Sequence, residues 1–214
     1  MKNYFIAIEG IDGSGKDTQL TNLMDEIRSD NNELFGNKYS NIWITREPTK
    51  ITESGKNISQ LLKGEEMSKE EATKLFISDR IEHSEIIRKI LNHSHVLSSR
   101  YDLSTLTYQM SQGMKFNDLY KLHNYTSKNG ALIPDLTIVF DLPVDIALER
   151  IGGRDSDREC FEKKDFLQKT RENTFYCIEK LKKLDNRKIL IVDGNQNQIK
   201  VKTEMINGIK KYLK

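Results

Sequence analysis

Glycines around a single lysine form the part of this sequence best suited to chemistry. The run contains Gly10, Ile11, Asp12, Gly13, Ser14, Gly15, Lys16, Asp17 and Thr18. Glycines let backbone N–H groups turn inward on phosphate oxygens, and a helix that starts here adds partial positive charge. Lys16 supplies a full positive charge to the terminal phosphates. The run therefore predicts a phosphate-binding loop that holds a nucleotide.

Asp17 departs from the usual pattern of such a loop. The residue after the lysine is usually Ser or Thr, whose hydroxyl binds Mg²⁺. In this chain a carboxylate stands where a polyphosphate should lie nearby. Two interpretations follow from charge. Either Asp17 holds Mg²⁺, which removes its repulsion with the phosphates, or it is a first-turn acid favoured by the helix dipole and turned away from the nucleotide.

A second candidate segment, residues 152–159, combines two glycines, two arginines and three acids. A solvated surface loop is one interpretation, because charged runs usually are that. The other is a mobile lid at about residues 151–160. Such lids exclude water and bring cations such as Arg154 or Arg158 to a phosphoryl group in transfer.

Short apolar strands alternate with helical patterns along the chain, which predicts an α/β fold with a five-stranded parallel sheet and helices on both faces. The loop fits this frame, because it follows an apolar strand and opens a helix with Leu20, Leu23 and Ile27 on one face. The strands are expected at residues 4–8, 41–45, 95–98, 136–141 and 188–192. The helices are expected at residues 18–29, 54–63, 69–92, 103–113, 116–129, 144–150, 161–184 and 200–212.

Composition limits the class of protein. A chain of 214 residues with 36% hydrophobic and 31% charged residues fits one globular domain, residues 1–214. The net charge of +2 gives no case for a nucleic-acid polymer or a membrane surface as partner. Cys160 and Cys177 lack metal-ligand spacing and are expected to be free thiols. With no signal-peptide pattern and no long apolar run, we expect a cytoplasmic protein.

Further motifs follow the loop in a fixed order, and together they resemble the thymidylate kinase family. They are Thr45-Arg-Glu-Pro48, Leu75-Phe-Ile-Ser-Asp-Arg-Ile-Glu-His83, the segment from Ser99 to Gln109, and the segments Pro134 to Pro143 and Ala147 to Arg150. The resemblance spans nearly the whole chain. It implies a P-loop kinase that transfers the γ-phosphoryl group of ATP to dTMP, for dTTP synthesis, with Mg²⁺. It also implies a homodimer packed through helices such as 69–92 and 103–113.

The resemblance implies a nucleoside site made by two helices. Phe76 and Arg80 lie four residues apart on one helix face, so they can address one ligand. The resemblance implies that Phe76 stacks on thymine and that Arg80 donates to its exocyclic oxygen. Thr105, Tyr108 and Gln109 match positions near the thymine edge and the deoxyribose, where a tyrosine ring would exclude a ribose hydroxyl. For an isolated helical Phe, a place in the core would be the usual interpretation.

Two arginines that follow strands, Arg46 and Arg100, resemble the family's ligands for the acceptor phosphate. Guanidinium groups suit a phosphate dianion because they donate two parallel hydrogen bonds. Surface salt bridges are the other interpretation of both. Asp12 matches the family's contact to the sugar 3′-hydroxyl and to the arginine after the second strand. Glu47 is expected to support that network without touching the substrate.

The donor side has its own candidates. Arg150 resembles the residue whose guanidinium lies on adenine, and the turn at residues 193–195 should face the same base. Some family members carry a catalytic arginine inside the phosphate loop, whereas this loop has Gly13, Ser14 and Gly15. The chain therefore resembles members that place this cation in the lid. Arg154 or Arg158 should reach the phosphoryl group, and the sequence does not select between them.

Ser99 is a second departure from the family pattern. The family commonly has a carboxylate at this strand end, which helps to hold Mg²⁺, usually through water. This chain lacks a carboxylate at 99 and has an extra one at 17. Because the two positions face one metal site in P-loop folds, our hypothesis is that Asp17 and Ser99 have exchanged roles.

The predicted catalytic residues, Lys16, Asp17, Arg100, Arg154 and Arg158, act by charge and position. An acceptor phosphate is largely dianionic at neutral pH, so no general base is needed and no histidine is expected to be catalytic. Two alternatives stay open. One is a kinase for another nucleoside monophosphate, and the other is a non-catalytic P-loop protein that binds nucleotide.

Overall fold

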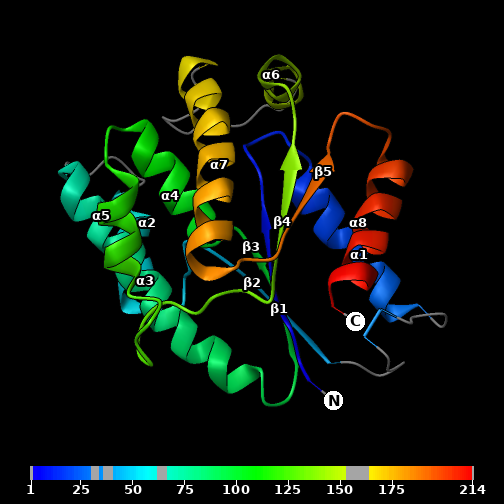
Figure 1. Ribbon diagram of the computed structural model, residues 1–214, viewed down its shortest axis with the longest axis horizontal. Helices are drawn as coiled ribbons and strands as arrows, with labels where there is room; N and C mark the ends of the chain where they lie inside the picture. Colours follow the sequence, from blue (N-terminus) through cyan, green and yellow to red (C-terminus); the bar gives the residue numbers. More distant parts are fainter. Residues whose placement is uncertain (1, 30–33, 36–40, 62–66, 153–163, 214) are drawn as a thin grey trace.

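The computed structural model describes residues 2–29, 34–35, 41–61, 67–152 and 164–213. Its centre is one sheet of five parallel strands in the order β2-β3-β1-β4-β5 (Figure 1). The strands are β1 (Phe5–Glu9), β2 (Ile42–Arg46), β3 (His95–Ser99), β4 (Leu136–Asp141) and β5 (Ile189–Asp193). The predicted α/β fold with a five-stranded parallel sheet is therefore confirmed.

The helices cover both faces of the sheet. In Figure 1, α1 and α8 lie on one face, while α3, α4, α5 and α7 lie on the other. The helix bounds are α1 (Lys16–Arg28), α2 (Glu53–Leu61), α3 (Lys69–Ile90), α4 (Asp102–Ser111), α5 (Phe116–His123), α6 (Val144–Gly152), α7 (Lys164–Asp185) and α8 (Gln198–Tyr212). No helix in the described part of the chain is long and apolar enough to cross a bilayer.

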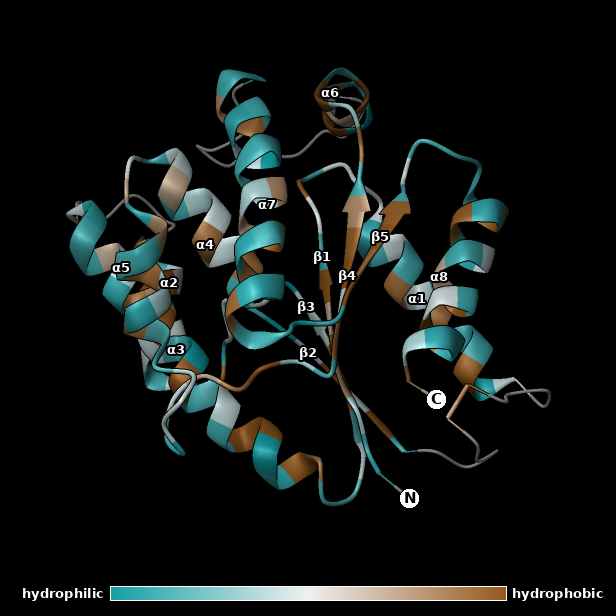
Figure 2. Cartoon of the chain, in the orientation of Figure 1, coloured by the Kyte–Doolittle hydropathy of each residue, from teal (hydrophilic) through white to brown (hydrophobic). Residues whose placement is uncertain are grey.

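The central strands are buried on both faces, as parallel sheets usually are. All five residues of β1 are buried, and their side chains alternate between the two faces. Ile6 and Ile8 join the core that α1 and α8 cover, whereas Phe5 and Ala7 join a cluster with Ile87 of α3. Burying one such side chain contributes about 1.5–3 kcal/mol, so β1 anchors both layers. Figure 2 shows β4 and β5 mainly in brown, between helices that carry teal and brown segments.

The sheet positions the site because its strands are parallel. Their carboxyl ends all lie at one edge, where the chain turns from each strand into the following segment. The phosphate loop leaves β1 in the middle of the sheet, Arg46 ends β2, and Arg100 follows β3. In Figure 1, α6 lies above the same edge, near the ends of β4 and β5.

Two predicted elements need correction or fall outside the description. Helix α5 was expected to reach residue 129 but ends at His123, because Asn124 adopts a left-handed conformation with φ 50°. Asn tolerates that conformation, which ends helices. Of the predicted lid at 151–160, the first two residues still belong to α6, and the remainder lies outside the described residues. Cys177 is a buried free thiol as expected, and Cys160 is outside the description.

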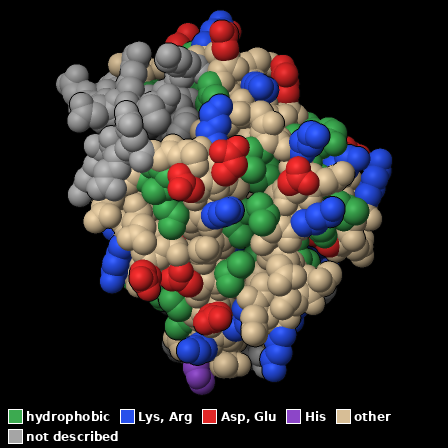
Figure 3. All heavy atoms as spheres, turned by 90° about the vertical axis from the view of Figure 1, so that its left-hand side faces the viewer, with side chains coloured by type: hydrophobic (Ala, Val, Ile, Leu, Met, Phe, Trp, Pro, Cys, Tyr) green, Lys and Arg blue, Asp and Glu red, His purple; other side chains and the backbone are tan. Residues whose placement is uncertain are grey.

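One face of the molecule shows how its charges are distributed. Figure 3 views the side that carries α2, α4 and α5, where basic and acidic side chains are interspersed. This agrees with the nearly balanced count of 34 basic and 32 acidic residues. No continuous basic surface is visible on the described part of this face.

Candidate active site

The phosphate loop is held in a conformation that depends on glycine. Gly13 and Gly15 have φ angles of 81° and 84°, which other residues rarely adopt. A Cβ atom at Gly13 would also lie 2.5 Å from the Ala147 carbonyl oxygen of α6. The Ile11 side chain is buried against α6, so residue 11 can meet a nucleotide only through its backbone. The loop is thus held in place by its contacts with α6, and it ends at the N-terminus of α1.

Lys16 opens α1 and is 5% exposed. Its Nζ lies 3.3 Å from Asp12 Oδ1, inside the same loop. Burial lowers the pKa of Lys16, and the nearby Arg100 charge lowers it further, while Asp12 and Asp17 oppose this. A buried ammonium group that faces a phosphate loop is suited to binding donor phosphates. Ser14 is buried in the loop, and Thr18 is exposed one residue beyond Asp17.

Arg100 joins the acceptor side of the site to the loop. It follows β3 with a φ of 66° and forms an ion pair with Asp12. Its Nη1 also donates to Tyr108 Oη at 3.3 Å, and its guanidinium lies over the Tyr108 ring at 5.3 Å. Burial alone would raise the pKa of Asp12, but the charges of Arg100 and Lys16 outweigh burial and lower it. Asp12 is therefore a carboxylate held between two cations.

Arg46 and Asp12 are not partners in the structure, which differs from expectation. Strand order explains the difference, because Asp12 follows β1 and Arg100 follows the adjacent β3. Arg46 ends β2, one strand farther away. Its side chain is exposed and makes no hydrogen bond or ion pair within the described residues. Arg46 is thus available at the open edge of the site.

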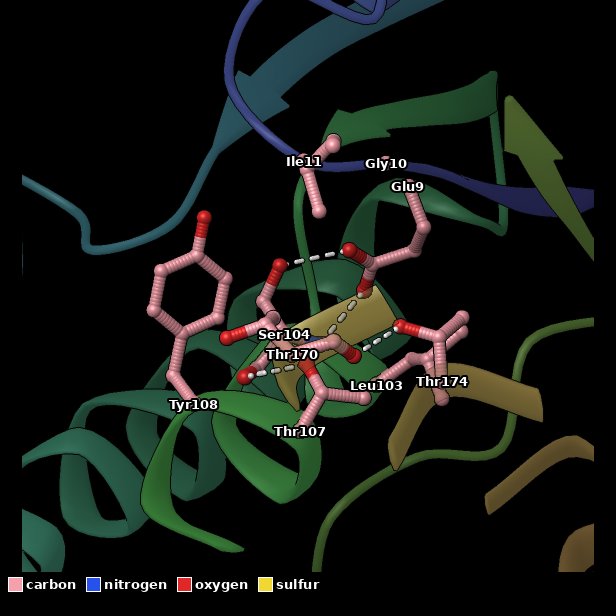
Figure 4. A pocket seen from close by; sticks show the side chains of 9 residues that line it. All are labelled: Glu9, Gly10, Ile11, Leu103, Ser104, Thr107, Tyr108, Thr170 and Thr174. Atoms are coloured by element: carbon pink, nitrogen blue, oxygen red, sulfur yellow. Dashed lines mark hydrogen bonds between the residues drawn. The ribbon is translucent and has the colours of Figure 1, made fainter. Parts of the chain in front are cut away.

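Glu9 is a site residue that the sequence reasoning missed. This carboxylate is 1% exposed and accepts from the backbone N–H groups of Tyr101 and Ser104, at 2.8 and 3.2 Å. It also accepts from Ser104 Oγ at 2.6 Å, and burial raises its pKa. Figure 4 shows Glu9 facing Ser104 in a small pocket between the loop, α4 and α7. Because Glu9 accepts from these two N–H groups at the start of α4, it fixes the backbone that directly follows Arg100. The signal was an acid at the end of a fully apolar strand.

Asp17 and Ser99 contact each other. Ser99 ends β3, and its Oγ donates to Asp17 Oδ1 at 2.7 Å. Burial opposes the ionisation of Asp17, but Ser99, Lys16 and Arg100 outweigh burial and lower its pKa. The prediction that these two positions face one another is confirmed. Asp17 is turned toward the end of β3 and not away from the loop.

The donor set suits Mg²⁺ only in part. A carboxylate beside a hydroxyl offers the hard oxygen ligands that this ion prefers. Across the described ranges, however, no group of three or more His, Cys, Asp or Glu side chains could hold a metal ion. Mg²⁺ usually binds through one or two carboxylates together with substrate phosphates. The residues present therefore fit an ion that enters with a nucleotide.

Arg80 lies in a buried polar network behind the expected nucleoside site. Its Nη2 donates to Glu47 and to the Tyr101 carbonyl oxygen at 2.9 Å, and its Nη1 contacts His123 Nε2 at 2.9 Å. Arg80 Nε is buried without a hydrogen-bond partner in the described structure. Glu47 also lies 2.9 Å from His83 Nδ1, so it belongs to the network of Arg80 and His83, whereas the sequence led us to expect it in the network of Asp12 and Arg46. The Arg80 guanidinium is thus fixed in direction, and its Nε–H is left without a partner among the described residues.

His123 is the neutral member of this network. Burial lowers its pKa to about 3, and the Arg80 charge acts in the same direction. Its Nδ1 lies 2.7 Å from the Leu119 carbonyl oxygen, which leaves Nε2 as the acceptor for Arg80. His83 is also fully buried, between Glu47 and Thr45 Oγ1. Both histidines are therefore buried residues with structural partners.

The other predicted nucleoside contacts lie on α3 and α4. Phe76 is half-buried and belongs to none of the hydrophobic core clusters. Phe76 is therefore not a core residue of the described structure. Thr105 is buried, and Tyr108 is half-buried beside Arg100. Gln109 is 4% exposed and accepts from Thr73 Oγ1 at 2.9 Å, so it connects α4 to α3.

Arg150 joins the loop to the turn after β5. Its Nη1 donates to the Gly13 carbonyl oxygen at 3.4 Å, and its Nη2 donates to the Gly194 carbonyl oxygen at 3.2 Å. The Gly194 N–H in turn donates to the Asp141 carbonyl oxygen at 2.7 Å. The residue expected on adenine and the turn expected to face it are therefore adjacent. Arg154 and Arg158 lie outside the described residues.

Comparison with known proteins gives a consistent family. A family sequence model described as thymidylate kinase matches residues 8–206. The probable thymidylate kinase of Methanococcus maripaludis is 34% identical over 212 residues, which cover 97% of this chain and 95% of the relative. That of Methanocaldococcus jannaschii is 32% identical over 213 residues, covering 99% and 96%. That of Pyrococcus horikoshii is 35% identical over 187 residues, covering 84% of each chain.

Proposed function

Since the chain belongs to the thymidylate kinase family, we propose that it transfers the γ-phosphoryl group of ATP to dTMP, giving dTDP and ADP for dTTP synthesis. One observation carries the proposal: Lys16 and Arg100 both contact Asp12. The first cation belongs to the donor-phosphate loop, and the second follows the strand where the acceptor phosphate is expected. Asp12 sets the spacing between them, which is what in-line transfer between two phosphates requires.

On the donor side, the loop N–H groups, the α1 N-terminus and Lys16 receive the ATP phosphates. Asp17, with Ser99 beside it, would hold Mg²⁺ together with the ATP phosphates, and the ion would supply neutralisation of the charge that develops during transfer. Arg150 and the 193–195 turn form the adenine side, supported by their contacts through Gly13 and Gly194. Arg154 and Arg158 remain the predicted lid cations for the phosphoryl group in transfer.

On the acceptor side, Arg100 and the exposed Arg46 bind the dTMP phosphate. That phosphate is largely dianionic at neutral pH, so it attacks without a general base. Asp12 orients Arg100 and accepts from the sugar 3′-hydroxyl. Charge neutralisation and position supply the catalysis, because little covalent chemistry is left for the protein.

For the nucleoside, we propose that Phe76 stacks on thymine and that Arg80 donates to its exocyclic oxygen. Glu47 and His123 hold the Arg80 guanidinium in one orientation, and this fixed orientation supports a role for Arg80 as a hydrogen-bond donor to the base. Thr105 lies at the thymine edge, and the Tyr108 ring excludes a 2′-hydroxyl by bulk. The role of Gln109 near the base stays a prediction, since its side chain is bonded to Thr73.

A panel of monophosphates tests this function. The purified chain is assayed with MgATP and dTMP, dUMP, UMP, CMP or AMP, and kcat/KM is measured for each. The absent methyl group of dUMP should reduce kcat/KM by about 10-fold or more. The ribonucleotides should lose at least ~100-fold more, because they add a 2′-hydroxyl that the Tyr108 ring would exclude.

Two results would contradict the proposal. A higher kcat/KM with UMP, CMP or AMP would identify a kinase for another monophosphate. ATP binding without any transfer would identify a nucleotide-binding protein that is not a kinase. Lys16→Met is the control for contaminating kinases and should lower kcat by about 100-fold or more, because it removes charge stabilisation of the phosphoryl group.

A homodimer is the further assembly that we propose from family membership. Helices α3 and α4 are the elements expected to meet a second copy. Sedimentation equilibrium of the purified chain tests this, with twice the mass of 24.9 kDa expected. A monomer of 24.9 kDa at micromolar concentration would contradict the proposed dimer.

A further inference from the structure

The contact between Asp17 and Ser99 reverses a familiar pair. In P-loop nucleotide-binding proteins, Mg²⁺ is held by a Ser or Thr after the loop lysine and by an Asp from a neighbouring strand. Here the carboxylate stands after Lys16, and the hydroxyl stands at the end of β3. The two side chains still meet, with Ser99 Oγ donating to Asp17 Oδ1 at 2.7 Å. The pair keeps one carboxylate and one hydroxyl, so its charge and donor types are unchanged.

We propose that Asp17 is the charged protein ligand for the Mg²⁺ of MgATP, directly or through one water, and that Ser99 holds its carboxylate in place. This inference rests on the proposed function, because it assumes that ATP phosphates lie in the loop. It adds a metal ligand at a position where loops of this kind carry a hydroxyl.

The orientation of Asp17 supports this assignment over a helix-dipole role. A first-turn acid that serves only the dipole would point into solvent, with no need of a partner on the sheet. Asp17 is exposed, yet its Oδ1 is bonded across to the end of β3. Its Oδ2 has no hydrogen bond or ion pair within the described residues, so one carboxylate oxygen is free.

The surroundings show why the metal must arrive with the nucleotide. One carboxylate and one hydroxyl are too few ligands to bind Mg²⁺ tightly, which prefers six oxygens and retains several waters. Phosphate oxygens and water supply the remainder. Without a metal, however, the Asp17 charge repels the triphosphate. Asp17 therefore disfavours metal-free ATP and favours MgATP.

This coupling is measurable by binding alone. Titration calorimetry gives the Kd of ATP in EDTA and the Kd of ATP in excess Mg²⁺. The first value divided by the second measures how strongly the metal favours ATP binding. In Asp17→Ser the ratio should fall by about 10-fold or more, mainly because metal-free ATP binds more tightly without the repelling charge. The exchanged variant Asp17→Ser/Ser99→Asp should return the ratio to within about 3-fold of the original.

Asp25→Ser is the matched control. Asp25 lies exposed on the same helix, and its replacement makes the same change in net charge. It should leave the ratio within about 2-fold. Ser99→Asp alone places two carboxylates together, and their repulsion should weaken metal-free ATP binding further.

An unchanged ratio in Asp17→Ser, equal to that of Asp25→Ser, would overturn the inference. The inference would also be overturned if the effects of Asp17→Ser and Ser99→Asp on this ratio were additive in the exchanged variant. Circular dichroism confirms folding of each variant, and the exposed position of Asp17 makes this a mild change. Failure of the proposed function is separate: if the chain binds ATP but does not phosphorylate dTMP, a lowered ratio in Asp17→Ser still supports the metal ligand.

Discussion

Glu47→Gln tests whether the buried network behind the nucleoside site is held together by charge. Glu47 and Arg80 form an ion pair whose side chains are 4% and 2% exposed. The same carboxylate lies 2.9 Å from His83 Nδ1. Removing one partner of a buried pair costs about 3–5 kcal/mol, because the other charge is left uncompensated. Gln keeps the shape and one acceptor oxygen, so we expect a loss of about 3 kcal/mol in the free energy of unfolding.

The assay is urea and thermal unfolding followed by circular dichroism. For a chain of this size, each kcal/mol lowers Tm by about 2–4 °C, so Tm should fall by about 6–12 °C. Glu85→Gln is the matched control, because Glu85 is exposed on α3 and should change stability by less than about 0.5 kcal/mol. A functional readout accompanies it: KM for dTMP should rise while KM for ATP stays the same, since Arg80 belongs to the acceptor side.

Refutation requires a double-mutant cycle. Arg80→Met leaves Glu47 buried without its cation, whereas Glu47→Gln/Arg80→Met removes both charges. The double variant should be more stable than the sum of the two single losses predicts, by about 1–3 kcal/mol. Additive losses, or a Glu47→Gln protein within about 1 kcal/mol of the original, would show that charge pairing does not hold this network.

Three further predictions follow from the site. Gly13→Ala should weaken ATP binding by at least ~10-fold in calorimetry, because the new Cβ meets the α6 backbone; Gly113→Ala, also at positive φ but in open space, should not. His123 has a pKa of about 3 when folded, against about 6.5 unfolded, so the unfolded chain binds one more proton between these values. Stability should therefore fall by about 1.4 kcal/mol per unit as pH drops through 6 to 5, and urea titrations of His123→Gln should show a shallower slope than the original protein. Arg187→Met leaves the buried Asp102 without its cation and should lose about 3–5 kcal/mol in urea unfolding, whereas an unchanged midpoint would contradict the ion pair's role.

The sequence predicted the fold because its signals are local. Buried strands read as short apolar runs, and the glycines and lysine of the loop follow β1 directly. Strand order then brings Lys16, Asp12 and Arg100 together, and the pairing of Asp17 with Ser99 also followed from that frame.

What the sequence left out depends on partners far apart along the chain. Glu47 meets Arg80 33 residues later, and Arg80 meets His123 43 residues later. No pattern around either residue signals such a contact. The prediction of a contact between Asp12 and Arg46 was wrong because of strand order. Asp12 follows β1 and Arg46 ends β2, and β3 lies between those two strands. The end of α5 at His123 was missed because Asn124 alone ends the helix.

Transfer of a labelled γ-phosphoryl group from ATP to dTMP is the most direct test of the account. With Mg²⁺ and the purified chain, the label should appear in dTDP in equal amount to ADP, and Lys16→Met should slow this transfer by about 100-fold or more. Label released as inorganic phosphate in the same amount as ADP, or ADP formed without labelled dTDP, would contradict this prediction. Either result would mean that Lys16, Asp12 and Arg100 do not place the donor and acceptor phosphates in line.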